Sequence, residues 1–317
     1  MFLRATTTAT NSTMLDYIMG NQTKYNELSA QASAQKKLLT PSDNPTDAIS
    51  VLNINKNLSQ INGYIDNMTQ AGNELNVLDN SLSSITKSLQ RAHDLAVQAA
   101  DGTNSTNSLG NIKIEIDQMI QSLKGIGNTR YNGSYIFAGN NVGTVPFVDS
   151  ANGGISYIGT PENKDYERYI QISEGVDTAI NIPGDELLGS YDPGTVGPPV
   201  VAPTGSGILK TLYEFSNALA TVPIDYNVIR PSMDAIKNNI QDISNLRTNF
   251  GSITNRFEMT KTSLDANVIQ LKSFKSDLED LDLAEALTNL ANQELALKAT
   301  MAVATKTLQS ASLLDYM

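Results

Sequence analysis

The residues able to carry out acid–base, nucleophilic or metal chemistry are few in this chain of 317 residues. It has no cysteine and a single histidine, His93. The lack of cysteine excludes thiol nucleophiles, disulfides and cysteine-based zinc or iron–sulfur sites. A histidine acts as a general base when a carboxylate orients it beside a nucleophile, and no motif near His93 predicts such partners. We therefore expect His93 to be a half-buried or solvent-exposed helix residue.

Two other segments match ligand-binding motifs only in part. Gly125 and Gly127 begin a dinucleotide-type loop, but Arg130 stands where that motif requires its third glycine. The acidic segment 277–282 lacks both the spacing and the glycine of a calcium loop. Because an apolar heptad pattern follows it, we expect its carboxylates to cap a helix. The sequence thus predicts a protein that is not an enzyme and has no cofactor, metal site or catalytic residue.

Charge and hydropathy narrow the classes of partner. The net charge of −11 disfavours binding to nucleic acid, because the phosphate backbone is itself negative. No run of about 18 apolar residues predicts a membrane span, and the first residues lack the apolar core of a secretory signal peptide. Charged residues make up 17% of the chain, against roughly 25% in an ordinary soluble domain. A weakly charged surface favours packing against copies or relatives of the same chain.

Glycine and proline are concentrated in the middle of the chain. Residues 133–207 hold 13 of the 21 glycines and 7 of the 11 prolines. Between these turn formers, β-type runs at 154–159 and 169–172 predict short strands. Segment 194–207 resembles an irregular linker. We therefore predict a small β-rich inserted domain over 140–206.

The flanks of this insert have the apolar spacing of long helices. Asn44, Pro45 and Asp47 form a helix-start signal: an N-cap, a proline at the first helical position and an acid in the first turn. From there an apolar stripe with steps of three and four continues to Ala99, which corresponds to about 80 Å of helix. Similar stripes cover 112–123 and 229–264. The predicted fold is mostly α: a long antiparallel helical bundle or coiled coil built by both flanks, with rod segments at 43–139 and 207–275.

Both ends of the chain carry a further heptad-type stripe, in segments 1–42 and 276–317. Either stripe could cover an ordinary core. Neither has a nearby partner except the other, so we expect them to pair with each other, with neighbouring molecules, or both. The candidate assembly residues are Met14, Ile18, Tyr25, Leu28 and Leu39 at the N-terminal end and Leu283, Leu287, Leu290, Leu297, Met301 and Leu308 at the C-terminal end. We predict that both ends are mobile in the free monomer and helical only in an assembly or on a chaperone.

Three segments together resemble the flagellin superfamily. Segment 35–44, QKKLLTPSDN, followed by Pro45, looks like that family's loop ending in Ser-Asp-Asp-Pro, with Asn44 in place of the second Asp. Segment 133–139, with Pro146 and Phe147 after it, resembles the entrance to the family's variable domain; its marker residues are Tyr135, Phe137, Gly139, Pro146 and Phe147. Segment 286–317 is similar to the family's C-terminal helix. The first residues depart from the family pattern.

The resemblance implies a structural adaptor of the bacterial flagellum. Such a protein joins the hook, through the first hook-associated protein, to the flagellin filament, as a ring of copies of itself. It implies an extracellular protein exported by the flagellar type III system, with an export chaperone on its C-terminal helix. The alternative is flagellin, the filament subunit itself, although the marker residues at 135–147 favour a junction protein. An enzyme housed in the insert and an intracellular coiled-coil scaffold are further alternatives.

Overall fold

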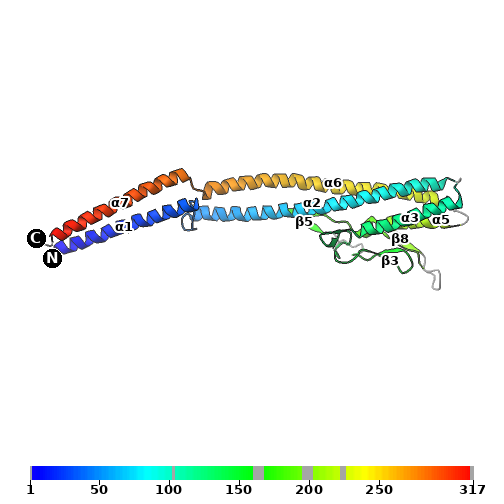
Figure 1. Cartoon of the computed structure of the whole chain (residues 1–317), viewed down its shortest axis with the longest axis horizontal. Coiled ribbons are helices and arrows are strands. Elements are labelled where there is room, and N and C mark those ends of the chain that lie inside the picture. Colours follow the sequence, from blue (N-terminus) through cyan, green and yellow to red (C-terminus); the bar gives the residue numbers. More distant parts are fainter. Residues whose placement is uncertain (1, 102–103, 160–167, 195–202, 222–225, 315–317) are drawn as a thin grey trace. The chain divides into compact units, whose positions relative to one another are not determined.

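A computed structural model describes residues 2–101, 104–159, 168–194, 203–221 and 226–314 (Figure 1). The chain divides into two compact units: unit 1 comprises Met1–Ile61 and Asp265–Met317, and unit 2 comprises Asn62–Leu264. The fold is mostly α, with long helices in both flanks and small antiparallel sheets in the middle of the sequence, which confirms the predicted fold class. Within the described residues, none of the helices combines the length and hydrophobicity that crossing a membrane requires.

Unit 1 consists of two terminal helices and the outer parts of two long ones. Helix α1 (Phe2–Ala34) and helix α7 (Leu283–Leu314) lie side by side and antiparallel (Figure 1). Helix α2 (Pro45–Ala100) follows α1, and helix α6 (Tyr226–Glu279) precedes α7. The predicted pairing of the two chain ends is therefore present within one molecule.

Unit 2 holds the main hydrophobic core. It is built by α2, α6 and two shorter helices, α3 (Thr106–Gly127) and α5 (Gly207–Ala220). The predicted stripe on α2 is buried from Met68 to Ala99, and the stripe on α6 alternates between buried and half-buried residues from Ile229 to Leu264. Each helix thus turns a single heptad row toward the core, which is why the spacing predicted these helices.

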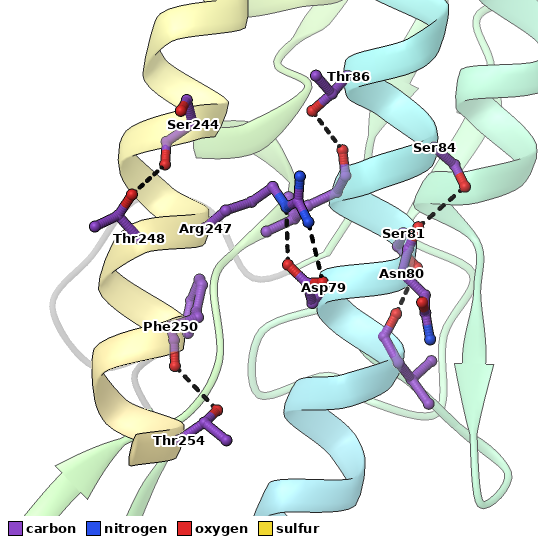
Figure 2. Close-up of polar contacts among 12 residues, drawn as sticks. Asp79, Asn80, Ser81, Ser84, Thr86, Ser244, Arg247, Thr248, Phe250 and Thr254 are labelled. Carbon is purple, nitrogen blue, oxygen red and sulfur yellow. Dashed lines mark hydrogen bonds and ion pairs between the residues drawn. The ribbon is translucent and has the colours of Figure 1, made fainter. Parts of the chain in front are cut away.

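Residues Asp79 and Arg247 link α2 to α6 at the surface of this core (Figure 2). Arg247 donates from Nε to Asp79 Oδ1 at 2.8 Å and from Nη2 to Oδ2 at 3.2 Å. A bidentate pair of this kind fixes geometry well, although both side chains are partly exposed and the pair adds little to stability. It sets the register of the two helices, while the apolar rows supply the burial.

The strands lie between α3 and α5 in the sequence. Strands β3 (Phe147–Asp149), β4 (Ile155–Tyr157), β7 (Ser190–Asp192) and β8 (Thr204–Ser206) form an antiparallel sheet in the order β3-β4-β7-β8. Two hairpins pair β1 (Arg130–Tyr131) with β2 (Ser134–Tyr135) and β5 (Tyr169–Ser173) with β6 (Val176–Ala179). A short helix, α4 (Gly184–Leu187), precedes β7. Both predicted β-type runs are strands.

Two details differ from the prediction. The segment expected to be an irregular linker ends in strand β8, which pairs with β7 in the register Tyr191 to Gly205; residues 195–202 lie outside the described residues. The C-terminal flank also begins with a separate helix, α5, before α6 starts. The buried face of α5 packs on α3 and β7, so it belongs to the core although its apolar row is only 14 residues long.

The β-rich insert shares its core with the helices. The ring of Phe147 lies against Gly127 of α3 and Gly184 of α4, so closely that a Cβ at either glycine would lie 2.6 or 2.7 Å from ring carbons. Asn128, which follows α3, accepts a hydrogen bond from Phe147 N and donates one to Phe147 O, both at 2.9 Å. The insert is therefore anchored to the end of α3 by a packed ring and by paired backbone hydrogen bonds.

Candidate functional site

The corner between α1 and α2 is built around Asn44. Its Oδ1 accepts hydrogen bonds from Thr46 N at 3.2 Å and Asp47 N at 3.3 Å, and its Nδ2 donates to Asp47 Oδ2 at 2.7 Å. These are the bonds of an N-cap residue, and Pro45 occupies the first helical position, where its missing N–H costs nothing. Asn44 and Asp47 are half-buried and Pro45 is exposed. The corner is a rigid start to α2.

Asp43 also shapes this corner, and the sequence analysis missed it. One carboxylate oxygen accepts from Leu39 N at 2.9 Å and Thr40 N at 2.8 Å, and the other accepts from the Thr40 hydroxyl at 2.7 Å. The hydrogen bonds from the side chain and backbone of Thr40, together with that from Leu39, hold the pKa of Asp43 below its usual range. The available signal was the Thr-Pro-Ser-Asp sequence, since Asp readily bonds to nearby backbone N–H groups in turns.

The acidic segment before α7 performs the capping that the sequence predicted. Asp282 Oδ1 accepts from Ala284 N at 2.9 Å and Glu285 N at 3.2 Å, which satisfies two free N–H groups at the start of α7. In the part of the chain that the structure describes, no group of acidic or histidine side chains is arranged to hold a metal ion.

The loop after α1 and the loop before α7 are bonded to each other. Lys37 N donates to Glu279 O at 2.9 Å and Leu281 N donates to Gln35 O at 3.2 Å, forming an antiparallel bridge between Lys36 and Asp280. Lys36 also forms an ion pair with Glu279, which raises the pKa of Lys36. Gln35 has φ of 56°, the left-handed conformation in which helices commonly end. The end of α1 and the start of α7 are therefore joined by backbone hydrogen bonds.

Helices α1 and α7 meet along a narrow row of side chains, the seam. On α1 the least exposed residues follow steps of four and three, and on α7 they do the same. The seam consists of Met14, Ile18, Asn21, Tyr25, Leu28 and Ala32 on α1, and of Ala286, Leu290, Gln293, Leu297, Thr300 and Ala304 on α7. This is the heptad spacing of a two-stranded coiled coil.

A polar layer interrupts the seam at Asn21. Asn21 Nδ2 donates to Thr300 Oγ1 at 2.9 Å, while Gln293 Nε2 donates to Asn21 O at 3.1 Å and Asn21 Oδ1 at 3.2 Å. Asn21 occupies a position at which heptad spacing would place an apolar residue, so the spacing alone assigns it no role. In coiled coils a polar side chain at a core position specifies register at some cost in stability, and this layer has the bonds to do so.

The predicted C-terminal stripe mixes two rows of α7. Leu290 and Leu297 lie in the seam, but Leu283, Leu287 and Met301 are exposed. Leu287 and Met301 are 14 residues apart and share one heptad position, which lies beside the row that contains Leu290. Leu283 is seven residues before Leu290 and so belongs to the same row, but it is the first residue of α7. Apolar residues therefore cover a wider arc of α7 than one partner helix can bury. Leu39 is also exposed, and the side chain of Leu308 lies outside the described residues.

Unit 1 consequently has little core of its own. Its buried apolar residues, within the described part, are Val268, Ala286, Leu297 and Ala304, whereas the other buried apolar side chains belong to unit 2. On its two terminal helices, the exposed apolar set comprises Leu15, Tyr17 and Met19 on α1 and Leu283, Leu287, Leu295, Met301 and Val303 on α7. Tyr17 and Val303 also line a shallow groove of about 370 Å³ between the two helices. Exposed apolar surface of this extent is typical of protein–protein contact.

Comparison with known proteins places this arrangement in a family. Residues 6–142 match the bacterial flagellin N-terminal helical region, and residues 233–317 match the bacterial flagellin C-terminal helical region. The two matches together include more than two thirds of the chain. The first contains most of α1 and the second contains α7, and these two helices pack against each other. The chain belongs to the flagellin family.

Within the flagellin family, the likeness extends over most of the chain both toward hook-associated protein 3 and toward a flagellin of Listeria innocua, which is 21% identical over 94% of this chain and 93% of that protein. The flagellar hook-associated protein 3 of Escherichia coli is 24% identical, over 89% of this chain and 90% of that protein. The crystal structure of Bacillus cereus FlgL is 25% identical and covers 72% of this chain and 99% of its own, with a TM-score of 0.54. A flagellin of Salmonella muenchen is 35% identical, but over only 26% of this chain and 18% of that protein.

The family's marker residues at the entrance to the insert are all buried in unit 2. Tyr135, Phe137, Gly139, Pro146 and Phe147 have little or no exposed surface. Phe137 O accepts hydrogen bonds from Gly184 N at 2.9 Å and from the Tyr157 hydroxyl at 3.0 Å, and burial raises the pKa of Tyr157 to about 12.

On the other side of this entrance, the Arg130 guanidinium lies 4.2 Å from the centre of the Tyr135 ring, which is a cation–π contact. The marker residues are thus buried where the insert packs against the helices, which is a structural role. His93 is half-buried on α2, as expected.

Proposed function

We propose that this chain is a structural adaptor of the bacterial flagellum, joining the hook, through the first hook-associated protein, to the flagellin filament. The observation that carries the proposal is the exposed apolar set of unit 1. Two long helices that cover each other along one narrow seam leave Leu287, Met301 and Tyr17 in water. Full burial of one such side chain is worth about 1.5–3 kcal/mol, so contact with neighbouring subunits would be strongly favourable.

Sequence identity and the solved structures support the junction over the filament. Hook-associated protein 3 of Escherichia coli is 24% identical over 89% of this chain, against 21% over 94% for the flagellin of Listeria innocua, and Bacillus cereus FlgL is 25% identical with a TM-score of 0.54. Flagellin itself remains the second candidate, because both flagellin helical regions match. The role proposed is structural in either case, since the features that mark unit 1 are apolar helix faces.

The partners follow from the same surface. On this proposal, copies of the chain form a ring, with the first hook-associated protein on one side and flagellin on the other. The protein leaves the cell through the flagellar type III system and is extracellular. Before export, a chaperone covers the exposed leucines of α7, which would otherwise promote aggregation.

Localisation on intact flagella tests the proposal. Gold-labelled antibody against the insert should mark one short band at the boundary between hook and filament. Deletion of the gene should leave hooks assembled and release flagellin into the medium, and the intact gene should restore filaments. Label along the whole filament would identify a filament subunit instead. Label confined to the cell interior would refute both flagellar roles.

A further inference from the structure

Unit 2 contains a polar pocket with a volume of about 240 Å³. The described residues that line it all belong to unit 2. Three elements meet there. Helix α2 contributes Gln70 and Glu74, which lie four residues apart and so share one helix face. The β1–β2 hairpin contributes Asn132 and Ser134, and Arg168 stands directly before strand β5. Asn132 has φ of 48° and Gly133 has φ of 84°, which is the geometry of a tight hairpin turn.

The charges in this pocket cancel. Of the described residues that line it, Glu74 and Arg168 are the charged ones, and they form an ion pair with each other. A free anion or a free cation would have to break this pair in order to bind. Gln70 and Asn132 are exposed and Ser134 is half-buried, so their side chains are accessible to a ligand in the pocket. Carboxamides and a hydroxyl offer donors and acceptors together, without net charge.

The remaining wall and the size of the pocket narrow the ligand further. Tyr131 lines it with an aromatic ring, Asn67 with a further carboxamide, and the aliphatic lining consists of Ala71, Ile136, Ile170 and Ile180. Sites for drug-sized ligands have volumes of about 300–1,000 Å³, so this pocket suits a single small ring. A sugar ring has hydroxyls that both donate and accept, C–H faces that pack on apolar side chains, and no charge.

We propose that the pocket binds one residue of a neutral saccharide. Gln70, Asn132 and Ser134 form hydrogen bonds to its hydroxyls, and Tyr131 packs against the ring. The Glu74–Arg168 pair stays intact and completes the polar wall. This inference is independent of the assembly role, because none of these residues belongs to unit 1.

Saturation-transfer NMR on the full-length chain tests the proposal. The probes are the methyl glycosides of glucose, galactose and N-acetylglucosamine, and the disaccharides that carry each sugar at the non-reducing end. At least one should bind saturably, with a Kd of about 1 mM, as expected for a few neutral hydrogen bonds. A disaccharide that binds more tightly than its methyl glycoside would identify a glycan as the source, and equal binding would identify the free sugar.

Two pocket variants and one control variant test whether the saccharide binds in this pocket. Gln70→Ala and Asn132→Gly should each weaken binding by about three- to tenfold, the loss of one neutral hydrogen bond. Glycine suits the left-handed turn at position 132, so the hairpin is kept. Gln90→Ala, on the same helix but outside the pocket, should bind as the parent does.

Several results would overturn the saccharide site. These are the absence of saturable binding by every probe, undiminished binding by both pocket variants, or displacement of the sugar by acetate or methylammonium. Displacement by either ion would show that the pocket binds charged ligands, which requires that the Glu74–Arg168 ion pair opens.

Discussion

Leu287 and Leu297 lie on the same helix but in opposite environments, and exchanging each for alanine separates monomer stability from assembly. Leu297 is 8% exposed in the seam, whereas Leu287 is 51% exposed beside it. Leu→Ala in a packed core costs about 2–5 kcal/mol. A seam between only two helices can relax, so we expect Leu297→Ala to cost about 2 kcal/mol. Half of the Leu287 side chain is already in water, so Leu287→Ala should cost less than about 1 kcal/mol in the monomer.

Amide hydrogen exchange along α7 measures these costs as local opening. About 2 kcal/mol corresponds to roughly 30-fold faster exchange in Leu297→Ala, against less than about fivefold in Leu287→Ala. Filament attachment in cells should show a different order: Leu287→Ala weakens attachment although its monomer is nearly unchanged. The reasoning would be refuted if Leu287→Ala opened α7 as much as Leu297→Ala, or if Leu287→Ala left attachment at the parent level.

Four further expectations concern stability, titration and order. Asn44→Ala should lower the stability of the α1–α2 corner by about 0.5–2 kcal/mol, and Asn44→Asp should not, which local exchange at the start of α2 would show. Gly127→Ala should destabilise unit 2 by about 1–3 kcal/mol because its Cβ would meet the Phe147 ring, whereas Gly125→Ala, with open space around it, should be neutral or stabilising; thermal melting compares them. The carboxyl of Asp43 should titrate below the value in an unfolded peptide, so its contribution to stability is present above that unfolded pKa and is lost as pH falls through the folded pKa; an NMR midpoint at or above the peptide value would contradict this. In a verified monomer, amides of unit 1 should exchange much faster than those of the unit 2 core, because the helices of unit 1 bury few apolar side chains and open more easily; equal protection would contradict this.

The helices of unit 2 could be predicted from the sequence because their buried residues are apolar and regularly spaced. Each long helix turns one apolar row to the core, and the rows from Met68 to Ala99 and from Ile229 to Leu264 can be read from spacing alone. Helix α5 was not separated from α6, because its apolar row covers only a few turns and directly follows a Gly-rich segment. Heptad spacing also does not reveal which neighbour covers a row.

That same limit explains the errors in unit 1. Helix α7 has apolar residues on more than one side, so periodicity alone joined Leu287 and Met301 to Leu297, although Leu297 lies in the seam and the other two are exposed beside it. The polar layer at Asn21 was invisible because its partners, Gln293 and Thr300, are far away in the sequence. Local signals were more reliable: the caps at Asn44 and Asp282 depend on neighbouring residues, and their hydrogen bonds are those expected from the sequence.

The polar layer of the seam joins residues 279 positions apart, Asn21 and Thr300, and this separation has a consequence for the order of folding. Contacts between such distant residues form late, because closing a large loop costs entropy before the contact repays it. Unit 2 shortens that loop when it folds, since the apolar rows of α2 and α6 then pack in one core and Lys261 Nζ donates to Thr69 Oγ1 at 3.3 Å. Helix α1 is synthesised before α7, so it must remain without its partner helix until α7 has been made.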